Sequence, residues 1–514
     1  MATSNSEIRL PHPVSFFFQL DPLVALSNAL ATRALYRGLL WSLLILIPTM
    51  FVGRFFCGWI CPLGSIHHFF SSRKSERKRG KALIESNRYK RWQATKYYLL
   101  VVCLAAAAFG TGLVGWFDPF SFLVRSLGLS VLPATDYGLR AFLSLLEHAR
   151  YSFVQDIGSG LHFLLGLLLL SFKQPYFRMG IWLGLIFVFL VAFNFRITRF
   201  WCRAICPLGA LLGIVSRWSV FGLVKNPEHC NDCNRCLLHC QGGDDPIGGV
   251  PWHQAECHLC MNCVDDCPEH GLRFEWCPGQ KTVGANLQRR KVLAGLAAGT
   301  VLIPLARSTP GFAVQRNERL LRPPGALDEG YFLSRCIRCG ECMKVCPNNA
   351  VHPAFHEAGL EGLWTPILVP RIGYCETSCV LCSQVCPTGA IWEITPNEKG
   401  WSDDAGRAEK PVRLGTAFYD RSRCLPWAMA TECIVCEEWC PTSPKAIYLR
   451  SAEVIDAAGN SKEVKQPYLD PSRCVGCGAC EYACPVQDRP AVYVTSVGES
   501  RSRTNQILLN RRKS

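Results

Sequence analysis

The feature that most constrains this 514-residue chain is the spacing of its cysteines. They recur at intervals of three in short runs of four, and most runs end in Cys-Pro. Three thiolates at this interval wrap one 4Fe-4S cluster, a cube, and the fourth thiolate reaches a neighbouring cube. Zinc ribbons instead use CxxC pairs that lie far apart. A chain of this length can bury a large core without cross-links, so its 30 cysteines indicate metal ligation rather than disulfides.

Six runs follow the pattern and supply the predicted cluster ligands. Four are regular, and the runs that begin at Cys375 and Cys424 are stretched at the front. We expect about six 4Fe-4S clusters, one for each run. The runs are Cys230, Cys233, Cys236 and Cys240; Cys257, Cys260, Cys263 and Cys267; Cys336, Cys339, Cys342 and Cys346; Cys375, Cys379, Cys382 and Cys386; Cys424, Cys433, Cys436 and Cys440; and Cys474, Cys477, Cys480 and Cys484.

Because the fourth cysteine of a run completes a neighbouring cube, the runs are expected to work in pairs. The first two runs form one pair, in which Cys267 joins the first run and Cys240 joins the second. For the last four runs we expect the first to pair with the fourth and the second with the third, by analogy with four-cluster electron-transfer subunits. Adjacent pairing is the rival arrangement, and the sequence does not decide between them.

Apolar stretches in the first third of the chain predict membrane helices. Residues 39–56, 95–116 and 179–197 each approach the ~20 residues that cross a bilayer. Hydrophobic residues make up 49% of the chain, and the mean hydropathy is +0.12. The loop at 71–96 carries ten Lys or Arg against two Glu, which places it in the cytoplasm. We therefore expect an α-helical membrane domain that crosses the bacterial inner membrane several times.

This part also contains a weak internal repeat with a second cysteine motif. LDPL at 20–23 precedes FCGWICPLG at 56–64, and FDPF at 117–120 precedes FWCRAICPLG at 200–209. Each copy ends in CxxxCP, with Cys57 and Cys61 in the first and Cys202 and Cys206 in the second. Cysteines four residues apart share one face of a helix end, so the repeat could bring four thiols together. They would ligate a further metal centre or cycle as dithiols; two structural turns are the alternative.

Composition divides the chain into four segments. Residues 1–222 form the expected membrane domain with the CxxxCP motifs, and residues 223–287 form a two-cluster ferredoxin module. Residues 288–310 (QRRKVLAGLAAGTVLIPLARS and flanks) resemble a twin-arginine signal or anchor, for which a plain linker helix is the alternative. Residues 311–514 form a four-cluster domain, which that signal would deliver to the periplasm. We expect loop-rich α+β modules of the bacterial ferredoxin type in both cysteine-rich segments.

The charge balance and the histidines exclude two other classes of protein. The formal net charge is +15, which alone suggests a nucleic-acid partner. Much of the excess lies in the loop at 71–96, and cubes bound by thiolates are net anions, so we expect no nucleic acid. The three apolar stretches contain no histidine to ligate a haem, so the chain is not a b-type cytochrome.

These motifs carry a family resemblance over nearly the whole chain. LDPL, FCGWICPLG and FWCRAICPLG, followed by two cysteine runs, resemble NapH and its relatives MauN and NosR. From residue 288, RRKVLAGL, RCIRCGECMKVCP and CVGCGACEYACP resemble NapG and MauM, so the chain is similar to a fusion of both types. It departs from them at Gln241, where Pro usually follows the run, and in having only about twenty residues before LDPL, where NapH-like proteins usually carry a helix.

The resemblance implies an electron-transfer subunit of the quinol dehydrogenase type. Quinol would be oxidised at the N-terminal part, and electrons would pass along the cubes to a separate redox protein. No molybdopterin or nitrate-binding pattern is present in the sequence. The alternative is an assembly or maturation factor that supplies electrons or clusters to a metalloenzyme, without its own quinol site. A polyferredoxin that only binds other proteins is a third reading.

Overall fold

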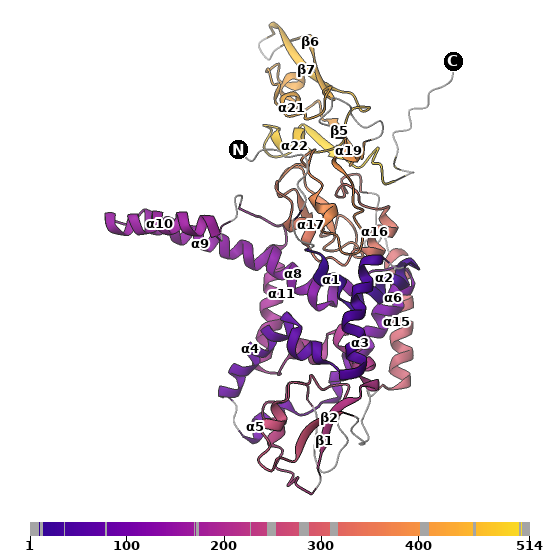
Figure 1. The fold of residues 1–514 in the computed structure, drawn as a ribbon. Coiled ribbons are helices and arrows are strands. Elements are labelled where there is room, and N and C mark those ends of the chain that lie inside the picture. Colours follow the sequence, from indigo (N-terminus) through magenta and orange to yellow (C-terminus); the bar gives the residue numbers. More distant parts are fainter. Residues whose placement is uncertain are drawn as a thin grey trace.

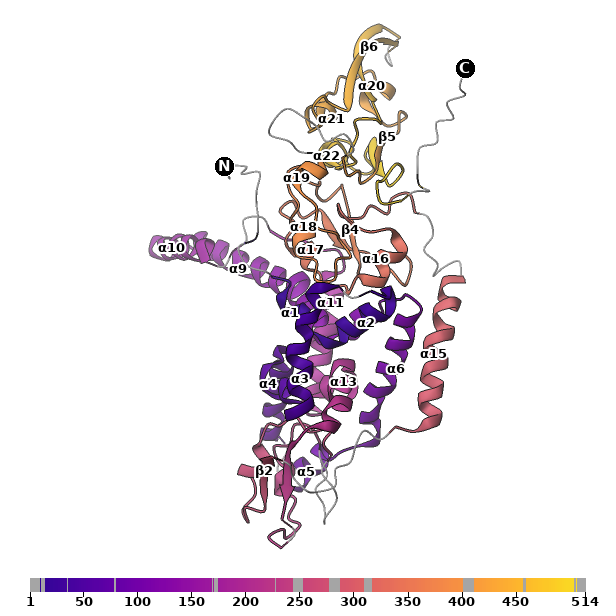
Figure 2. The ribbon, with the colours of Figure 1, turned by 45° about the vertical axis from the view of Figure 1, so that its right-hand side comes forward.

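The computed structural model describes residues 10, 14–34, 36–77, 80–168, 170, 174–226, 228–243, 253–276, 287–308, 317–400, 411–455, 459–502 and 505. The molecule is elongated (Figures 1 and 2). A helical part lies in the middle, a small module containing β1 and β2 lies at one end, and the cysteine-rich C-terminal half lies at the other. The helix α15 runs beside α6 and connects the two ends.

The helical part extends from residue 14 to residue 218. Two of its helices, α9 and α10, pack against each other and project as an arm away from the rest (Figure 1). The elements are α1 (Phe16–Gln19), α2 (Pro22–Thr32), η1 (Arg37–Ser42), α3 (Leu43–Val52), η2 (Phe56–Ile60), α4 (Pro62–Arg77), α5 (Lys81–Asn87), η3 (Arg91–Ala94), α6 (Thr95–Ala108), α7 (Val114–Phe117), α8 (Pro119–Ser126), η4 (Leu127–Val131), α9 (Leu132–Glu147), α10 (Ser152–Leu168), α11 (Gly180–Ala192), η5 (Phe193–Phe195), α12 (Phe200–Ala204), α13 (Pro207–Val215) and η6 (Ser216–Trp218).

The expected membrane domain is not found. Among the described residues, no helix combines the length and the apolar character needed to cross a bilayer. The apolar stretches are divided into shorter helices: α3 has 10 residues, α6 has 14 and α11 has 13. Gly53, at φ +101°, ends α3, and Gly110, at φ +79°, follows α6. The predicted α-helical membrane domain and the multi-pass inner-membrane location derived from it are therefore wrong, because hydropathy counts residues without regard to these breaks.

The two copies of the repeat meet inside the helical part. Asp21 accepts hydrogen bonds from the backbone N–H groups of Leu23 (2.7 Å) and Val24 (3.3 Å) and so caps α2. Asp118 caps α8 in the same way, through the N–H of Ser121 (2.7 Å). Both carboxyl groups are fully buried, and burial together with the Asp118 carboxylate raises the pKa of Asp21 well above its usual value. Equivalent residues of the two copies therefore face each other.

Residues 221–276 form the N-terminal cluster module. It contains one antiparallel pair of strands, which aligns Phe221 with Trp276 and Lys225 with Leu272. Stacked Phe221 and Phe274 and the buried Leu223 and Leu259 supply its small apolar core. The elements are β1 (Phe221–Lys225), η7 (Arg235–Leu237), α14 (Asn262–Asp265) and β2 (Leu272–Trp276), followed by α15 (Arg289–Ser308).

The C-terminal half, residues 317–502, is built from very short elements around buried cysteines. The longest is a hairpin of β6 and β7, in which Ile447 pairs with Leu469 and Ile455 with Ser461. The elements are α16 (Glu329–Arg335), α17 (Glu341–Lys344), β3 (Val351–Pro353), β4 (Pro366–Leu368), α18 (Leu381–Gln384), α19 (Pro396–Lys399), β5 (Thr416–Tyr419), α20 (Leu425–Ala428), α21 (Val435–Glu438), β6 (Ile447–Ile455), β7 (Ser461–Leu469), α22 (Ala479–Ala483) and β8 (Val492–Thr495); β3 pairs with β4 and β5 with β8.

Buried arginines attach both modules to the helical part through backbone carbonyl groups. At one end, Arg54 donates to the carbonyl oxygen of Ala255 at 2.7 Å. At the other end, Arg125 donates to the backbone carbonyl oxygen of Arg338 at 3.0 Å. The Arg338 side chain in turn donates to the backbone carbonyl oxygen of Gly112. These bonds satisfy buried carbonyl groups in cysteine loops that have little regular structure of their own. Each loop is therefore held in place by the helices.

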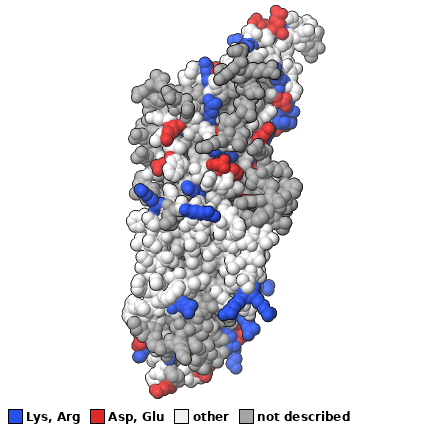
Figure 3. All heavy atoms as spheres, turned by 90° about the vertical axis from the view of Figure 1, so that its right-hand side faces the viewer, with Lys and Arg blue, Asp and Glu red and all other residues white. Residues whose placement is uncertain are grey.

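The surface of the helical part is unusually apolar. Leu44 on α3, Phe163 on α10 and Ile181 on α11 are 55%, 79% and 80% exposed. Figure 3 shows an uncharged zone across one face, with lysines and arginines on both sides of it. Extended apolar surfaces of this kind mark contacts with apolar partners or ligands.

Candidate metal centres

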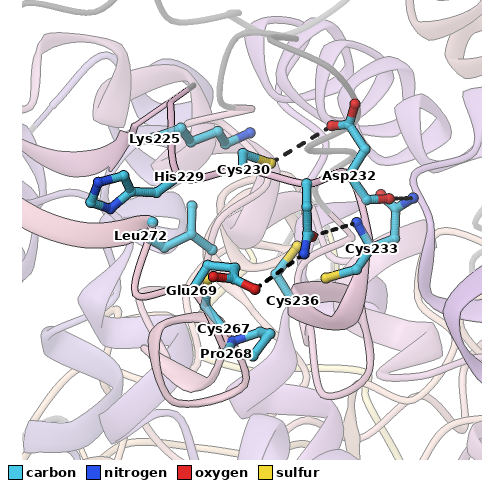
Figure 4. A pocket seen from close by; sticks show the side chains of 13 residues that line it. Lys225, His229, Cys230, Asp232, Cys233, Cys236, Cys267, Pro268, Glu269 and Leu272 are labelled. Atoms are coloured by element: carbon cyan, nitrogen blue, oxygen red, sulfur yellow. Dashed lines mark hydrogen bonds between the residues drawn. The ribbon is translucent and has the colours of Figure 1, made fainter.

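The N-terminal cluster module brings the first predicted quartet around one cavity. Cys230, Cys233, Cys236 and Cys267 line this cavity together (Figure 4). Cys267 comes from the second run, as the spacing predicts for a ligand shared between neighbouring cubes. Cys230 and Cys233 are exposed, so this centre lies at the outer surface of the molecule.

The second quartet lies beside the first. Cys240, Cys257, Cys260 and Cys263 line a neighbouring cavity that also touches Cys236. Burial and the sulfurs of Cys257 and Cys240 raise the pKa of Cys263 well above its usual value. Metal binding deprotonates such thiols, which would otherwise stay neutral in this environment.

In the C-terminal half, two further cavities are each lined by cysteines from two adjacent runs. Cys346 joins Cys375, Cys379 and Cys382 around one of them. The other is lined by Cys440 together with Cys474, Cys477 and Cys480. The fourth cysteine of one run thus meets the first three cysteines of the next run.

The remaining cysteines complete the reciprocal half of each pair. Burial raises the pKa of Cys342 well above its usual value, and the nearby sulfurs of Cys339, Cys336, Cys386 and Cys382 raise it further, so Cys386 of the next run lies close to the first three cysteines of this one. In the same way, burial and the nearby sulfurs of Cys436, Cys433 and Cys484 raise the pKa of Cys424. The runs are therefore paired in chain order, and the expected pairing of the first with the fourth and the second with the third is wrong.

Short local structures aim the sulfurs inward. The third cysteine of each run in this half lies in a four- or five-residue helix, as Cys342 does in α17 and Cys480 in α22. In two of these runs the fourth cysteine accepts a backbone N–H bond from the following loop: Ala350 donates to Cys346 Sγ and Ile391 to Cys386 Sγ, both at 3.3 Å. Such N–H groups stabilise the thiolate that binds iron.

The pairing predicts which replacements affect the same cube. We expect Cys386→Ala and Cys336→Ala each to remove about four iron atoms per chain, and the double variant to remove no more than either single one. Cys386→Ala combined with Cys436→Ala removes about twice as much, because these residues belong to different cubes. Iron assays on anaerobically purified protein measure both losses. If the iron losses add for Cys386→Ala with Cys336→Ala but not for Cys386→Ala with Cys436→Ala, the run that begins at Cys375 pairs with the run that begins at Cys424 instead.

The CxxxCP cysteines also meet, in the interior of the helical part. Cys57, Cys61, Cys202 and Cys206 are between 6% and 9% exposed. After burial, Cys202 and Cys57 are the groups that most raise the pKa of both Cys61 and Cys206. Cys57, Cys61 and Cys206 also belong to one buried core, so the thiols of the two copies form one buried group.

Two arginines that the sequence analysis did not single out lie among these thiols. Arg54 Nη2 is 3.9 Å from Cys57 Sγ, and Arg199 Nη1 donates to the carbonyl oxygen of Cys57 at 2.9 Å. Each arginine stands three residues before the first cysteine of its copy, in RFFC and RFWC. The same position of an arginine in both copies is the sequence signal that could have identified these two residues. Within the described residues, no three His, Cys, Asp or Glu side chains are arranged to hold a single metal ion.

A larger cavity of about 570 Å³ lies between the base of the arm and the C-terminal half. Leu132, Leu139 and Phe177 supply apolar walls, and Asp136 is a buried acid in its lining. Cys346 and Pro347 line both this cavity and the neighbouring cysteine cavity. Cysteine spacing and hydropathy do not reveal this site, because it is formed by segments that are distant in the sequence.

Comparison with known proteins agrees with this arrangement. A family model described as a 4Fe-4S dicluster domain matches residues 335–390 and 430–487. A second, described as a 4Fe-4S binding domain, matches residues 34–81 and 179–226. The ferredoxin-type protein NapG of Escherichia coli is 34% identical over 206 residues, which is 40% of this chain and 80% of that protein. The chain belongs to the NapG and MauM family of ferredoxin-type proteins.

Further relatives extend the match. The methylamine utilization ferredoxin-type protein MauM of Methylophilus methylotrophus is 34% identical over 202 residues, 39% of this chain and 81% of that protein. The putative electron transport protein YccM of Escherichia coli is 24% identical over 276 residues, 52% of this chain and 64% of that protein. No solved structure matches the chain significantly. This member of the NapG and MauM family is thus a multi-cluster 4Fe-4S ferredoxin-type protein.

Proposed function

We propose that the chain is a polyferredoxin that takes electrons from quinol and passes them through six 4Fe-4S clusters to a separate redox protein. The observation that carries the proposal is that 24 cysteines fall into six quartets, arranged as three reciprocal pairs. Bound there, each cube would supply a one-electron carrier beside a second one. A chain of neighbouring carriers is suited to relay rather than to bond-making chemistry.

The cavity of about 570 Å³ supports quinol as the donor. Its size and its mostly apolar walls suit a flat, apolar ring that carries two hydroxyl groups. Cys346, a member of the adjacent cysteine quartet, also lines this cavity, so a ring bound there would lie against a predicted cluster ligand. Asp136, hydrogen-bonded to Arg140 at 3.0 Å, supplies a carboxylate to take a hydroxyl proton.

Quinol oxidation releases two protons and two electrons and leaves the quinone. In this site the Asp136 carboxylate accepts one proton, and water at the cavity mouth accepts the other. Lys344, which also lines the cavity, provides a positive charge that favours the loss of the hydroxyl protons. The electrons leave singly on the side of Cys346.

The test is reduction of the anaerobic full-length protein by menadiol, followed through the visible absorption of the clusters. Asp136→Asn keeps the size of the side chain but removes the proton acceptor, so we expect reduction to slow about 100-fold. Reduction by dithionite, which does not need the cavity, stays unchanged. Asp156→Asn, an exposed position on the arm helix α10, is the matched control. An unchanged menadiol rate in Asp136→Asn would refute the quinol site.

The exposed first quartet is the observation that favours the assembly or maturation role. A centre bordered by exposed Cys230 and Cys233 is open to a docking protein. Transfer of iron and sulfide from the loaded chain to an apo-ferredoxin, without reduction by menadiol, would establish that role instead. Electron transfer to the ferredoxin without loss of iron would establish the relay.

A further inference from the structure

We infer that the four CxxxCP cysteines hold one additional iron–sulfur cluster, shared between the two copies of the internal repeat. Cys57 and Cys61 supply half of its ligands, and Cys202 and Cys206 supply the other half. This centre is additional to the six of the proposed relay, and the inference does not depend on the electron donor.

The ligand count within each copy is the first argument. The family model described as a 4Fe-4S binding domain matches residues 34–81 and 179–226, and each of these segments contains only its two CxxxCP cysteines. Two thiolates are half of the four that hold a 4Fe-4S cluster. Cys57, Cys61 and Cys206 belong to one buried core. Arg199, three residues before Cys202, donates to the carbonyl oxygen of Cys57 at 2.9 Å, so the two copies together supply a complete set.

The buried charges are the second argument. Arg54, Arg199, Arg203 and Lys96 are at most 1% exposed around this group, and Glu256 is the carboxylate that pairs with Lys96. The Nε atoms of Arg54 and Arg199 have no hydrogen-bond partner. Buried cations require a compensating anion. An iron–sulfur cluster with four thiolates carries a net negative charge of about two and supplies it.

The local backbone suits thiolate ligands. Cys61 and Cys206 directly precede Pro62 and Pro207, the first residues of α4 and α13. Cys206 Sγ accepts the backbone N–H of Gly209 at 3.2 Å. Each of these two sulfurs therefore lies at a helix N-terminus, where free N–H groups and the helix dipole stabilise negative charge. The arginines contribute a second, independent source of positive potential.

The centre lies between the two cluster modules. On one side, Arg203 donates to the carbonyl oxygen of Cys240 at 3.0 Å, so the CxxxCP loop touches the second quartet. A Cβ atom on Gly58 would come within 2.1 Å of the carbonyl oxygen of His258, so only glycine permits this approach. On the other side, Cys57, Cys61 and Cys206 share one continuous buried core with Cys339 of the C-terminal half.

Iron and sulfide assays on the anaerobically purified full chain test the inference. We expect each of two double variants to contain about four iron atoms and four sulfide ions fewer than the intact chain. These variants are Cys57→Ala/Cys61→Ala and Cys202→Ala/Cys206→Ala. The quadruple variant loses no more, because both pairs hold one centre. Cys103→Ala is the matched control, because Cys103 is a buried cysteine of the same helical part that lies outside the motif.

Three outcomes would overturn the inference. Iron and sulfide unchanged in every variant would make the thiols structural or redox-active without metal. Losses that add in the quadruple variant would mean two separate centres. Zinc in place of iron in the intact chain, removed by the same replacements, would mean a single-ion site. The iron of the other six quartets serves as the folding check, and an intact chain with about 28 iron atoms rather than 24 supports the centre without any variant.

Discussion

Removing iron from the intact protein should unfold residues 317–502 while most helices of the helical part persist. In the C-terminal half, cysteines of four runs form part of the hydrophobic core, and most helices there have four residues. Helices this short do not form on their own. Metal binding at structural sites contributes about 10 kcal/mol or more to folding, as much as the whole stability of many domains. With the four cubes proposed for this half, the loss of iron therefore exceeds what it can tolerate.

Limited proteolysis with mass spectrometry measures this difference between the two parts. After treatment with a chelator and a mild oxidant, we expect cleavage throughout residues 317–502. The helical part supplies most of its own apolar core, including Leu23, Leu63 and Phe120, and should give longer-lived fragments. Protein treated with iron-saturated chelator is the control. Equal resistance of residues 317–502 before and after iron removal would show that the fold does not depend on its clusters.

The second large effect concerns the ion pair that attaches the N-terminal cluster module to α6. We expect Glu256→Ala to lower the free energy of unfolding by about 3–5 kcal/mol, because it leaves a buried ammonium group unpaired. Lys96 and Glu256 side chains are 1% and 5% exposed, and the Tyr97 hydroxyl also donates to Glu256 at 2.8 Å. Burial lowers the pKa of Lys96, which shows how much its charge depends on this partner.

Anaerobic urea unfolding of three variants separates this effect from general damage. Glu85→Ala removes an exposed partner of Arg88 and should cost about 0–1 kcal/mol. The double variant Lys96→Met/Glu256→Met replaces both charges by apolar groups and should recover most of the loss. A cost below about 1 kcal/mol for Glu256→Ala would show that water reaches the pair.

The grouping of the cysteines within each run follows from local chemistry. CxxCxxC places three thiolates around one cube within a few residues, so the spacing alone identifies Cys336, Cys339 and Cys342 as partners. The fourth ligand is a tertiary contact. Whether Cys346 reaches the second or the fourth run depends on how the chain folds back, and the cysteine spacing carries no information on that path.

The helical part was less predictable, because its structure also depends on tertiary contacts that the sequence pattern does not show. Hydropathy recognised its apolar stretches, but the residues that interrupt them, such as Gly53 and Gly110, are few and short-range in effect. Arg54 and Arg199 were overlooked because a single charge at the end of an apolar stretch is unremarkable. Their role depends on the contact between the two copies, which brings both arginines to Cys57.

The placement of the cysteine-rich modules at opposite ends of the helical part bears on the order of events in turnover. A carrier with a single binding face must release its donor before its acceptor can bind there. Here the cavity next to Cys346 and the exposed edge at Cys230 and Cys233 belong to different ends of the molecule. In the proposed relay, donor and acceptor would therefore bind at the same time, and turnover would proceed through a ternary complex rather than by alternating occupation of a single surface.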